Sequence, residues 1–119
     1  MYRDLALYLD GDWTAASNGN VKNGIDPSSE DVIGSIAAAT ADDLHTALAA
    51  AERGFETWRR TGTWERAAKL RKVAELIRQR IDDIAVLMSI ETGKPVAEAK
   101  GETGAAADQF EWYAEETKR

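Results

Sequence analysis

The segment ETGKP, residues 91–95, constrains the fold more than any other stretch of the sequence. Gly93 suits the position just after a helix, because glycine adopts a left-handed backbone there without a Cβ clash. Pro95 suits the first position of a following helix, because the N–H that proline lacks would have no partner there. The segment therefore predicts a hinge at which one helix stops and the next begins.

Upstream of this hinge, helical patterning begins at Thr40, a favourable N-cap followed by two acidic residues, Asp42 and Asp43, in the first turn. We expect a first helix that ends near Arg59 and Arg60. The residues predicted to form its apolar stripe follow the helical period: Leu44, Ala47, Leu48, Ala51, Phe55 and Trp58.

A second helix is expected to begin with Thr63 as its cap and to run to Gly93. Its predicted buried face consists of Ala67, Leu70, Val73, Ala74, Ile77, Ile81, Ile84 and Met88. The same helix carries the basic residues Arg66, Lys69, Arg71, Lys72, Arg78 and Arg80. Acidic residues interrupt them, so we interpret them as a solvated face with local ion pairs, such as Glu65 with Lys69, rather than a nucleic-acid patch.

A third helix is predicted from Pro95 to Glu116, with a line of small residues at Ala97, Gly101, Gly104 and Asp108. Each glycine inside a helix costs about 1 kcal/mol relative to alanine. Such a line favours close approach by another element. The alternative is that these are tolerated surface glycines.

Residues 5–38 have the short apolar runs and turn clusters of a small antiparallel hairpin unit. DGD and SNGN are turn signals, and Asp26 before Pro27 predicts a turn between two short strands. We therefore divide the chain into an N-terminal β-hairpin unit, residues 1–39, and a three-helix segment, residues 40–119.

Composition excludes several classes of site. The 119 residues carry a net charge of -6 and no cysteine, which excludes disulfides, thiolate metal sites and a cysteine nucleophile within this chain. His45 is the only histidine and is expected at the surface. The acidic balance argues against nucleic acid as a partner. Without an 18-residue apolar run or a secretory leader pattern, we expect no membrane span and a soluble, cytoplasmic protein.

No catalytic motif was found either. The sequence lacks a dinucleotide-binding glycine fingerprint, a Walker A loop and a zinc-protease motif. Neighbouring acidic residues diverge by about 100° on a helix, so they are interpreted as capping or solubilising pairs. Lys94 is interpreted as structural, and the four tryptophans, Trp13, Trp58, Trp64 and Trp112, as anchors between elements. The residues by themselves indicate a compact acidic α+β piece.

The order of several motifs does carry a resemblance. LYLDGDW, IDPSSEDVIGSIAAAT, ALAAAERGFETWR, ERAAKLRKVAELI, IETGKPVAEAKGE and FEWYAEETKR follow one another along the chain. This succession resembles the N-terminal portion of the NAD(P)-dependent aldehyde dehydrogenase superfamily, from about Leu7 to Arg119. GKPVAEAKGE and FEWYAEETKR look most like the succinate-semialdehyde dehydrogenase branch. Asp26 stands where the family commonly has asparagine.

The resemblance implies an α/β fold, in which the chain is the N-terminal part of a Rossmann-like cofactor domain. It implies an oxidoreductase that uses NAD or NADP and a small-molecule aldehyde, with the catalytic cysteine, the glutamate base and the cofactor lysine all beyond this chain. No cofactor is expected for this chain alone. In some relatives a monovalent cation is bound by oxygens that align with Gly24, Ile25 and Glu102.

Two hypotheses follow. In the first, the chain is a truncated fragment of an aldehyde dehydrogenase, inactive by itself, whose partner is the rest of the enzyme chain. In the second, it is a stand-alone helical binding or scaffold module without catalysis. Exposed helix faces would favour the first hypothesis, and self-association through those faces is a compromise between the two.

Overall fold

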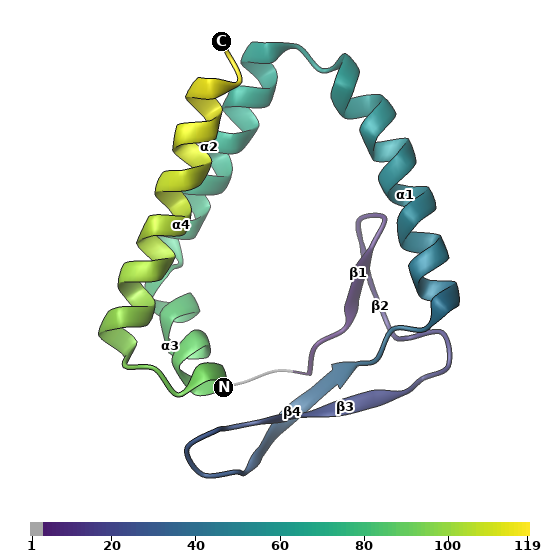
Figure 1. The fold of residues 1–119 in the computed structure, drawn as a ribbon, viewed down its shortest axis with the longest axis vertical. Coiled ribbons are helices and arrows are strands. Elements are labelled where there is room, and N and C mark those ends of the chain that lie inside the picture. Colours follow the sequence, from purple (N-terminus) through teal and green to yellow (C-terminus); the bar gives the residue numbers. More distant parts are fainter. Residues whose placement is uncertain (1–3) are drawn as a thin grey trace. The chain divides into compact units, whose positions relative to one another are not determined.

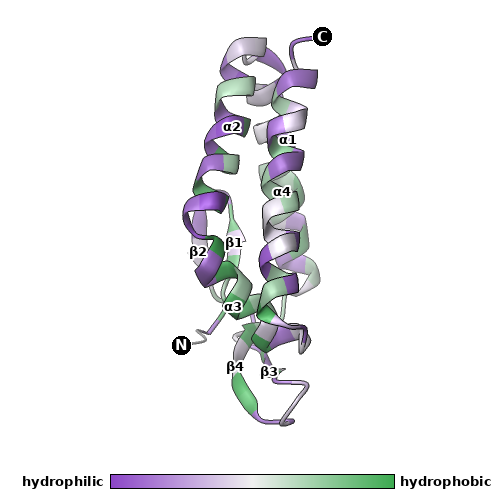
Figure 2. Cartoon of the chain, turned by 90° about the vertical axis from the view of Figure 1, so that its left-hand side faces the viewer, coloured by the Kyte–Doolittle hydropathy of each residue, from purple (hydrophilic) through white to green (hydrophobic). Residues whose placement is uncertain are grey.

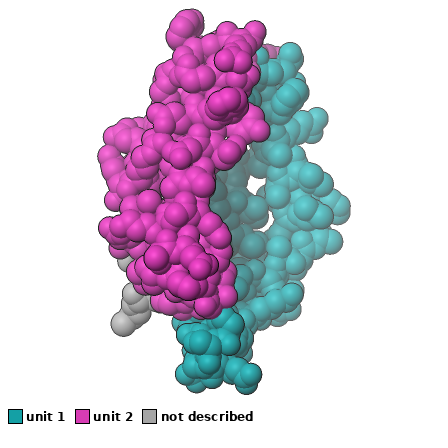
Figure 3. All heavy atoms as spheres, turned by 60° about the vertical axis from the view of Figure 1, so that its left-hand side comes forward, with its two compact units in different colours: residues 1–59 teal, residues 60–119 magenta. Residues whose placement is uncertain are grey.

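The computed structural model describes residues 4–119. The chain divides into two compact units, and the boundary along the sequence lies between Arg59 and Arg60. Figure 3 colours the two units separately, and each is described by itself. The boundary falls inside a helix, whereas the sequence pattern changes after residue 39. The assignment of residues 1–39 and 40–119 to separate segments of a larger domain stays a prediction.

Unit 1 begins with two antiparallel hairpins (Figure 1), as the sequence predicted. The first joins β1 (Leu7–Leu9) to β2 (Asp12–Thr14). Its two-residue loop, Asp10 and Gly11, has φ angles of 53° and 96°. Both angles are positive, as a type I′ hairpin turn requires, and glycine takes such an angle without strain.

The second hairpin joins β3 (Val21–Ile25) to β4 (Val32–Ala37). Asp26 organises the turn between them, since its Oδ1 accepts hydrogen bonds from the Ser28 hydroxyl at 2.6 Å and the Ser28 N–H at 2.7 Å. These bonds favour the ionised carboxylate and lower the pKa of Asp26. The predicted Asp-Pro-Ser-Ser turn is confirmed. Leu5 adds a single parallel bridge to Ile36.

Helix α1 (Ala41–Arg60) starts and ends where the sequence predicted. Thr40 and Asp43 form a reciprocal capping box. The Thr40 N–H donates to Asp43 Oδ2 at 2.8 Å, and the Asp43 N–H donates to Thr40 Oγ1 at 3.2 Å. Asp43 also accepts the Ser17 N–H, at 3.1 and 3.2 Å. The Thr40 bond is the main reason that the pKa of Asp43 is lowered.

Unit 2 contains three helices, α2 (Thr63–Gln79), α3 (Ile81–Thr92) and α4 (Val96–Glu116). The chain therefore has four helices in the described residues rather than the three expected, because the predicted second helix breaks at Arg80. The Arg80 φ of -110° leaves the helical range, and its N–H is shared between the Leu76 and Ile77 carbonyls. Asp82 and Asp83 then lie in the first turn of α3, where acidic side chains favour a helix start.

Thr63 was predicted to cap the second helix, and this is wrong. Gly62 occupies the N-cap position with an extended backbone, φ -61° and ψ 148°, and no side chain caps the helix. Thr63 is instead the first residue of α2. Gly62 is compatible with the extended cap geometry, so the helix begins one residue earlier than the threonine suggested.

The three helices of unit 2 bury a set of small residues that we call the alanine seam. Its members are at most 3% exposed: Ala67 and Ala74 on α2, Ala85 on α3, and Ala99, Thr103, Ala107 and Ala114 on α4. Small side chains let the backbones of packed helices approach closely. Among the described residues, no large side chain is fully buried. Figure 2 shows that α3 carries strongly hydrophobic positions at one end of this unit.

The predicted small-residue line on the third helix does not coincide with this seam. Ala97, Gly101 and Asp108 are exposed. A Cβ built on Gly101 would meet no atom within 4 Å, and one on Gly104 would lie 3.9 Å from Ile81 Cδ1, an ordinary contact. Neither glycine marks a tight approach within this chain. The residues of α4 that are buried, Ala99, Thr103, Ala107 and Ala114, lie on a different face of the helix.

The predicted apolar stripe of α1 is largely exposed. Five of its six residues are exposed, and four of these, Leu44, Leu48, Ala51 and Phe55, are called the α1 stripe below. Three of the tryptophans predicted as anchors between elements have mostly exposed side chains: Trp13, Trp64 and Trp112 are 70%, 73% and 63% exposed. Within residues 4–119 no helix has an apolar run long enough to cross a membrane.

Candidate functional site

The hinge between α3 and α4 is the most distinctive local structure of unit 2. Gly93 adopts φ 73° and its N–H donates to the Ser89 carbonyl at 2.9 Å, which ends α3 as predicted. Pro95 follows with φ -58°, and its carbonyl accepts the N–H groups of Glu98 and Ala99, both at 3.0 Å. The predicted stop and restart are thus confirmed, and α4 begins one residue after the proline.

Side-chain hydroxyls hold the hinge closed. The Ser89 hydroxyl donates to the Lys94 carbonyl at 2.7 Å, across the bend. The Thr92 hydroxyl donates to the Met88 carbonyl at 2.7 Å, which satisfies an acceptor of the last turn of α3. Sequence reasoning missed both hydroxyls. A serine four residues before the glycine is the signal that indicates such a contact.

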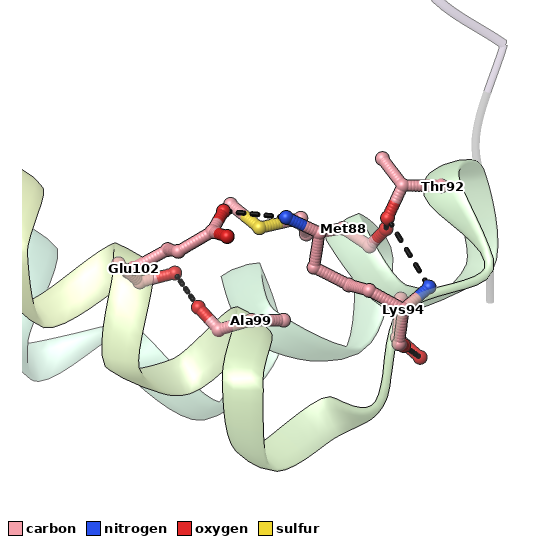
Figure 4. Close-up of polar contacts among 7 residues, drawn as sticks. Met88, Thr92, Lys94, Ala99 and Glu102 are labelled. Carbon is pink, nitrogen blue, oxygen red and sulfur yellow. Dashed lines mark hydrogen bonds and ion pairs between the residues drawn. The ribbon is translucent and has the colours of Figure 1, made fainter.

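Lys94 and Glu102 join the hinge to the body of α4. Figure 4 shows the Lys94 ammonium reaching the Glu102 carboxylate, with Nζ 2.6 Å from Oε2. The Lys94 side chain is 26% exposed and that of Glu102 is 58% exposed. Lys94 also follows the negative end of α3, where a cation is favoured. The pair therefore links the hinge to the second turn of α4.

The chemistry available at this hinge is limited. It has a lysine whose ammonium is already paired, two hydroxyls that donate to backbone carbonyls, and neither a histidine nor a cysteine. A nucleophile needs an adjacent base to activate it, and these residues supply none. The predicted structural role of Lys94 agrees with this geometry.

A row of ion pairs connects α4 to α2 and α3. Arg78 Nη2 lies 2.7 Å from Asp108 Oδ1 and 2.6 Å from Glu111 Oε2, and these two hydrogen bonds raise the pKa of Arg78. Lys100 Nζ lies 2.5 Å from Asp82 Oδ1. The paired side chains are at least 43% exposed, so each pair adds little stability, but together they place opposite charges beside one another along the helices.

Glu115 lies at one end of this row. It accepts hydrogen bonds from Lys118 and, at 2.6 Å, from Arg71 Nη2. The Lys118 ammonium, and then the Arg71 guanidinium, lower the pKa of Glu115 to about 2. The pairs Lys69–Glu65 at 3.0 Å and Lys72–Glu75 at 2.8 Å confirm that basic residues of the predicted second helix form local ion pairs.

The predicted cation ligands belong to different units. Gly24 and Ile25 are adjacent on β3, where the pairing with β4 shifts register between them. Glu102 lies on α4, and its carboxylate is already paired with Lys94. A metal ion would therefore have to compete with an ammonium for this carboxylate. The cation site therefore stays a prediction. His45, which the sequence analysis placed at the surface, is exposed on α1.

The hollow formed by residues 4–6 and Trp13 in unit 1 does not fit a nucleotide cofactor. A pyrophosphate is held by a cradle of backbone N–H groups, commonly at a glycine-rich helix start, or by cations. The hollow found in unit 1 is instead lined by Asp4, Leu5, Ala6 and Trp13, a carboxylate and three apolar groups. Nowhere in residues 4–119 do three histidine, cysteine or acidic side chains gather in a metal-binding cluster.

The geometry of these residues does not identify a protein family, but comparison with known proteins does. The model of the aldehyde dehydrogenase family matches residues 13–119. The NADP(+) succinate-semialdehyde dehydrogenase of Escherichia coli (strain K12) is 42% identical over all 119 residues, which are 24% of its length. A glutarate-semialdehyde dehydrogenase of Pseudomonas putida is 42% identical over 112 residues, covering 94% of this chain and 23% of its own.

Solved structures agree. An E. coli NADP-dependent enzyme matches 97% of this chain with a TM-score of 0.91 and 42% identity, over 24% of its own chain. A NAD-dependent aldehyde dehydrogenase from Sinorhizobium meliloti matches 95% of it with a TM-score of 0.88 and 36% identity, over 23% of its own chain. The chain thus spans about a quarter of the length of these relatives.

Proposed function

Because the chain belongs to the aldehyde dehydrogenase family, we propose that it is the N-terminal segment of an NAD(P)-dependent aldehyde dehydrogenase. The observation that carries this proposal is the 42% identity to a succinate-semialdehyde dehydrogenase over all 119 residues, which make up only 24% of that relative. The fold class predicted from the sequence, a piece of an aldehyde dehydrogenase domain, is confirmed by the family match and the solved structures. We expect the full enzyme in the cytoplasm.

The reaction that we propose for the full enzyme is oxidation of an aldehyde to its acid through a cysteine thioester, with NAD or NADP as the oxidant. Succinate semialdehyde is the first substrate to test and glutarate semialdehyde the second, since relatives named for both are 42% identical to this chain. The cofactor and the reacting groups would be held by residues outside this chain. Its own residues supply helix packing and the hinge.

The competing hypothesis is a stand-alone binding or scaffold module. The exposure of apolar side chains on the last helix discriminates between the two. Val96, Trp112 and Tyr113 on α4 are 47%, 63% and 59% exposed. An autonomous module would cover such groups, whereas a segment of a larger domain leaves them for its neighbours. This exposure supports the segment hypothesis.

A fusion enzyme tests the proposal. Residues 1–119 of this chain are joined to the part of the E. coli succinate-semialdehyde dehydrogenase that follows its matched segment. We expect the fusion enzyme to reduce NADP when succinate semialdehyde is added, because the grafted segment supplies the same packing. A fusion enzyme that folds without any aldehyde-dependent turnover would refute the proposal.

The isolated 119-residue chain is the matched control. It has no cysteine to form a thioester, so we expect no aldehyde-dependent reduction of NAD or NADP above a blank. Saturable turnover by the isolated chain would contradict its assignment as an inactive segment. The two assays share substrate, cofactor and buffer, which makes the difference between them attributable to the added polypeptide.

A further inference from the structure

Asparagine followed by glycine occurs twice in unit 1, in two different backbone settings. Asn18–Gly19 lies in the loop between β2 and β3, and Asn23–Gly24 lies within β3. An asparagine loses its side-chain amide when the backbone nitrogen of the next residue attacks Cγ, and a following glycine favours this attack because it has no Cβ to obstruct it. The two dipeptides have the same residue types, so a difference in their reactivity must come from the fold.

The Asn18 side chain is folded back over the peptide bond that would react. Its Oδ1 accepts the Asn20 N–H at 2.9 Å, two residues further on, which is an Asx turn. Closing this hydrogen-bonded ring turns Asn18 Cγ toward the Gly19 nitrogen, because that nitrogen is itself a member of the ring. Gly19 has a left-handed φ of 70°, which glycine adopts without strain. The loop therefore holds the electrophilic carbon close to the nucleophilic nitrogen.

The same hydrogen bond favours the reaction electrostatically. Attack at Cγ moves negative charge onto Asn18 Oδ1, and the Asn20 N–H already donates to that oxygen. A donor placed at a developing oxyanion stabilises the transition state. One contact opposes the attack, since the Gly19 N–H donates to the Ala16 carbonyl at 2.8 Å. Gly19 is exposed, and a single turn hydrogen bond at an exposed residue opens at little cost in free energy.

The second dipeptide is held in an unreactive arrangement. Asn23 pairs with Ser35 and Gly24 pairs with Gly34, and the register shift of this hairpin comes after both pairs. Side chains of a strand stand roughly perpendicular to the sheet, which keeps the Asn23 amide away from the next backbone nitrogen. Gly24 is also buried. Attack at this site requires β3 to separate from β4 over several residues, which costs more free energy than opening one turn.

The loop that contains the reactive dipeptide is attached at both ends. Before it, Ser17 donates its N–H to Asp43, and the Ser17 hydroxyl lies 2.8 Å from Thr40 Oγ1, so the loop contacts the capping box of α1. After it, the Asn20 carbonyl accepts the Ala38 N–H at 2.9 Å. An additional backbone atom between these two attachments would displace one of them.

We propose that Asn18 is a site of spontaneous deamidation, and that its isoaspartyl product releases the loop from the start of α1. The Gly19 nitrogen bonds to Asn18 Cγ, the bond from Cγ to Nδ2 breaks, and ammonia leaves with the proton lost from the Gly19 nitrogen. Water then opens the resulting succinimide. Opening at Cγ gives aspartate, whereas opening at the backbone carbonyl gives isoaspartate, whose main chain runs through Cγ and gains an atom. This chemistry does not depend on the proposed function.

The relative rates at the two dipeptides test the site. The isolated chain and the fusion enzyme are incubated in mildly alkaline buffer, and mass spectrometry follows replacement of each side-chain amide by a carboxylate. Cleavage after Lys22 places Asn18 and Asn23 on separate peptides. Asn23 is the matched control, because it also precedes glycine. We expect Asn18 to react at least about tenfold faster than Asn23, and the two rates to converge in concentrated urea, where the fold is lost.

A tenfold difference in either protein supports the site. Equal rates at the two asparagines in both proteins without urea, or a faster reaction at Asn23, would overturn it.

The effect on α1 is tested with the product. Anion exchange recovers the deamidated isolated chain, and an isoaspartyl-specific methyltransferase measures its isoaspartate content. Asn18→Asp is the matched control, because it has the same charge, a normal backbone and an oxygen that still accepts the Asn20 N–H. We expect amide hydrogen exchange at Ser17 and in the first turn of α1 to be at least about fivefold faster in the isoaspartyl chain than in Asn18→Asp. Equal exchange would overturn the release of the loop.

Discussion

Unit 2 buries a seam of small residues between its helices, although Trp112 and Tyr113 of α4 stay exposed, whereas in unit 1 the large apolar residues of the α1 stripe are exposed. In unit 2 the alanine seam is closed and charged side chains pair across the helices. In unit 1, α1 is capped and tethered by polar groups while Leu48 and Phe55 are more than half exposed. The difference shows that capping interactions can define where a helix begins while its apolar side chains remain exposed to solvent.

The largest expected effect comes from overfilling the seam. Ala107→Leu places three extra carbons at a position with 0% exposure, where no space is open, and we expect a loss of about 1–3 kcal/mol in the free energy of unfolding. Urea titration followed by circular dichroism measures it. Ala106→Leu, at an exposed position of the same helix, should change stability by less than about 0.5 kcal/mol. Equal effects of the two variants would show that the seam is not packed.

A smaller effect is expected at the start of α1. Thr40→Ala removes the side-chain cap of the capping box and should cost about 1 kcal/mol, felt in unit 1 rather than in unit 2. Amide hydrogen exchange resolves the two units, and faster exchange should be confined to the first turns of α1. Thr46→Ala, which removes a γ-methyl group and a hydroxyl that donates to the Asp42 carbonyl but takes away no helix cap, is the control. Faster exchange across α2 and α4 would contradict the separation of the units.

Acid should weaken the ion pairs of unit 2 over a defined range. The folded-state pKa of Glu115 is lowered from 4.5 to about 2, so its contribution is fully present above about pH 4.5 and is lost as the pH falls through about 2. Glu115→Gln should therefore flatten the dependence of the thermal midpoint on pH between those values. Glu98→Gln removes a carboxylate from the same helix and serves as control. An unchanged pH profile for Glu115→Gln would refute the role assigned to this pair.

The smallest effect is expected on the α1 stripe. Leu48→Asp in the isolated chain should change the free energy of unfolding by less than about 0.5 kcal/mol, because the side chain is exposed. The same substitution in the fusion enzyme should lower its thermal midpoint clearly, because a charge would then be buried. Ala49→Asp is the matched control in both proteins. Similar small effects in the two proteins would remove the contrast between the units.

The features predicted well from the sequence depend on contacts within a few residues. Gly93 ends α3 through its own backbone angle, Thr40 caps α1 through a partner three residues on, and Asp26 builds its turn with Ser28. Each of these interactions is local, so the residue type and its immediate neighbours decide it.

The features predicted poorly depend on packing. The apolar period runs unbroken through Ile77, Ile81 and Ile84, with neither glycine nor proline, so the break at Arg80 was missed. Basic residues before it and the acidic pair Asp82 and Asp83 after it are the available signal. On α4, small residues lie on several faces, and only contact with α2 and α3 selects the buried one. At the candidate site, the sequence predicted the helix stop at Gly93 and the restart at Pro95. It did not predict the hydrogen bond from the Ser89 hydroxyl to the Lys94 carbonyl.

The close spacing of the unit 2 contacts along the chain has a consequence for synthesis. The ion pair of Arg71 with Glu115, for example, joins residues 44 positions apart. A nascent chain emerges from the ribosome with its N-terminal end first and folds in units as they appear. In the full enzyme that we propose, the helical unit could close as soon as Arg119 is outside the ribosome. The apolar residues of the α1 stripe are of the kind that a chaperone for nascent apolar segments binds, so this interval is when such a chaperone would act on this chain.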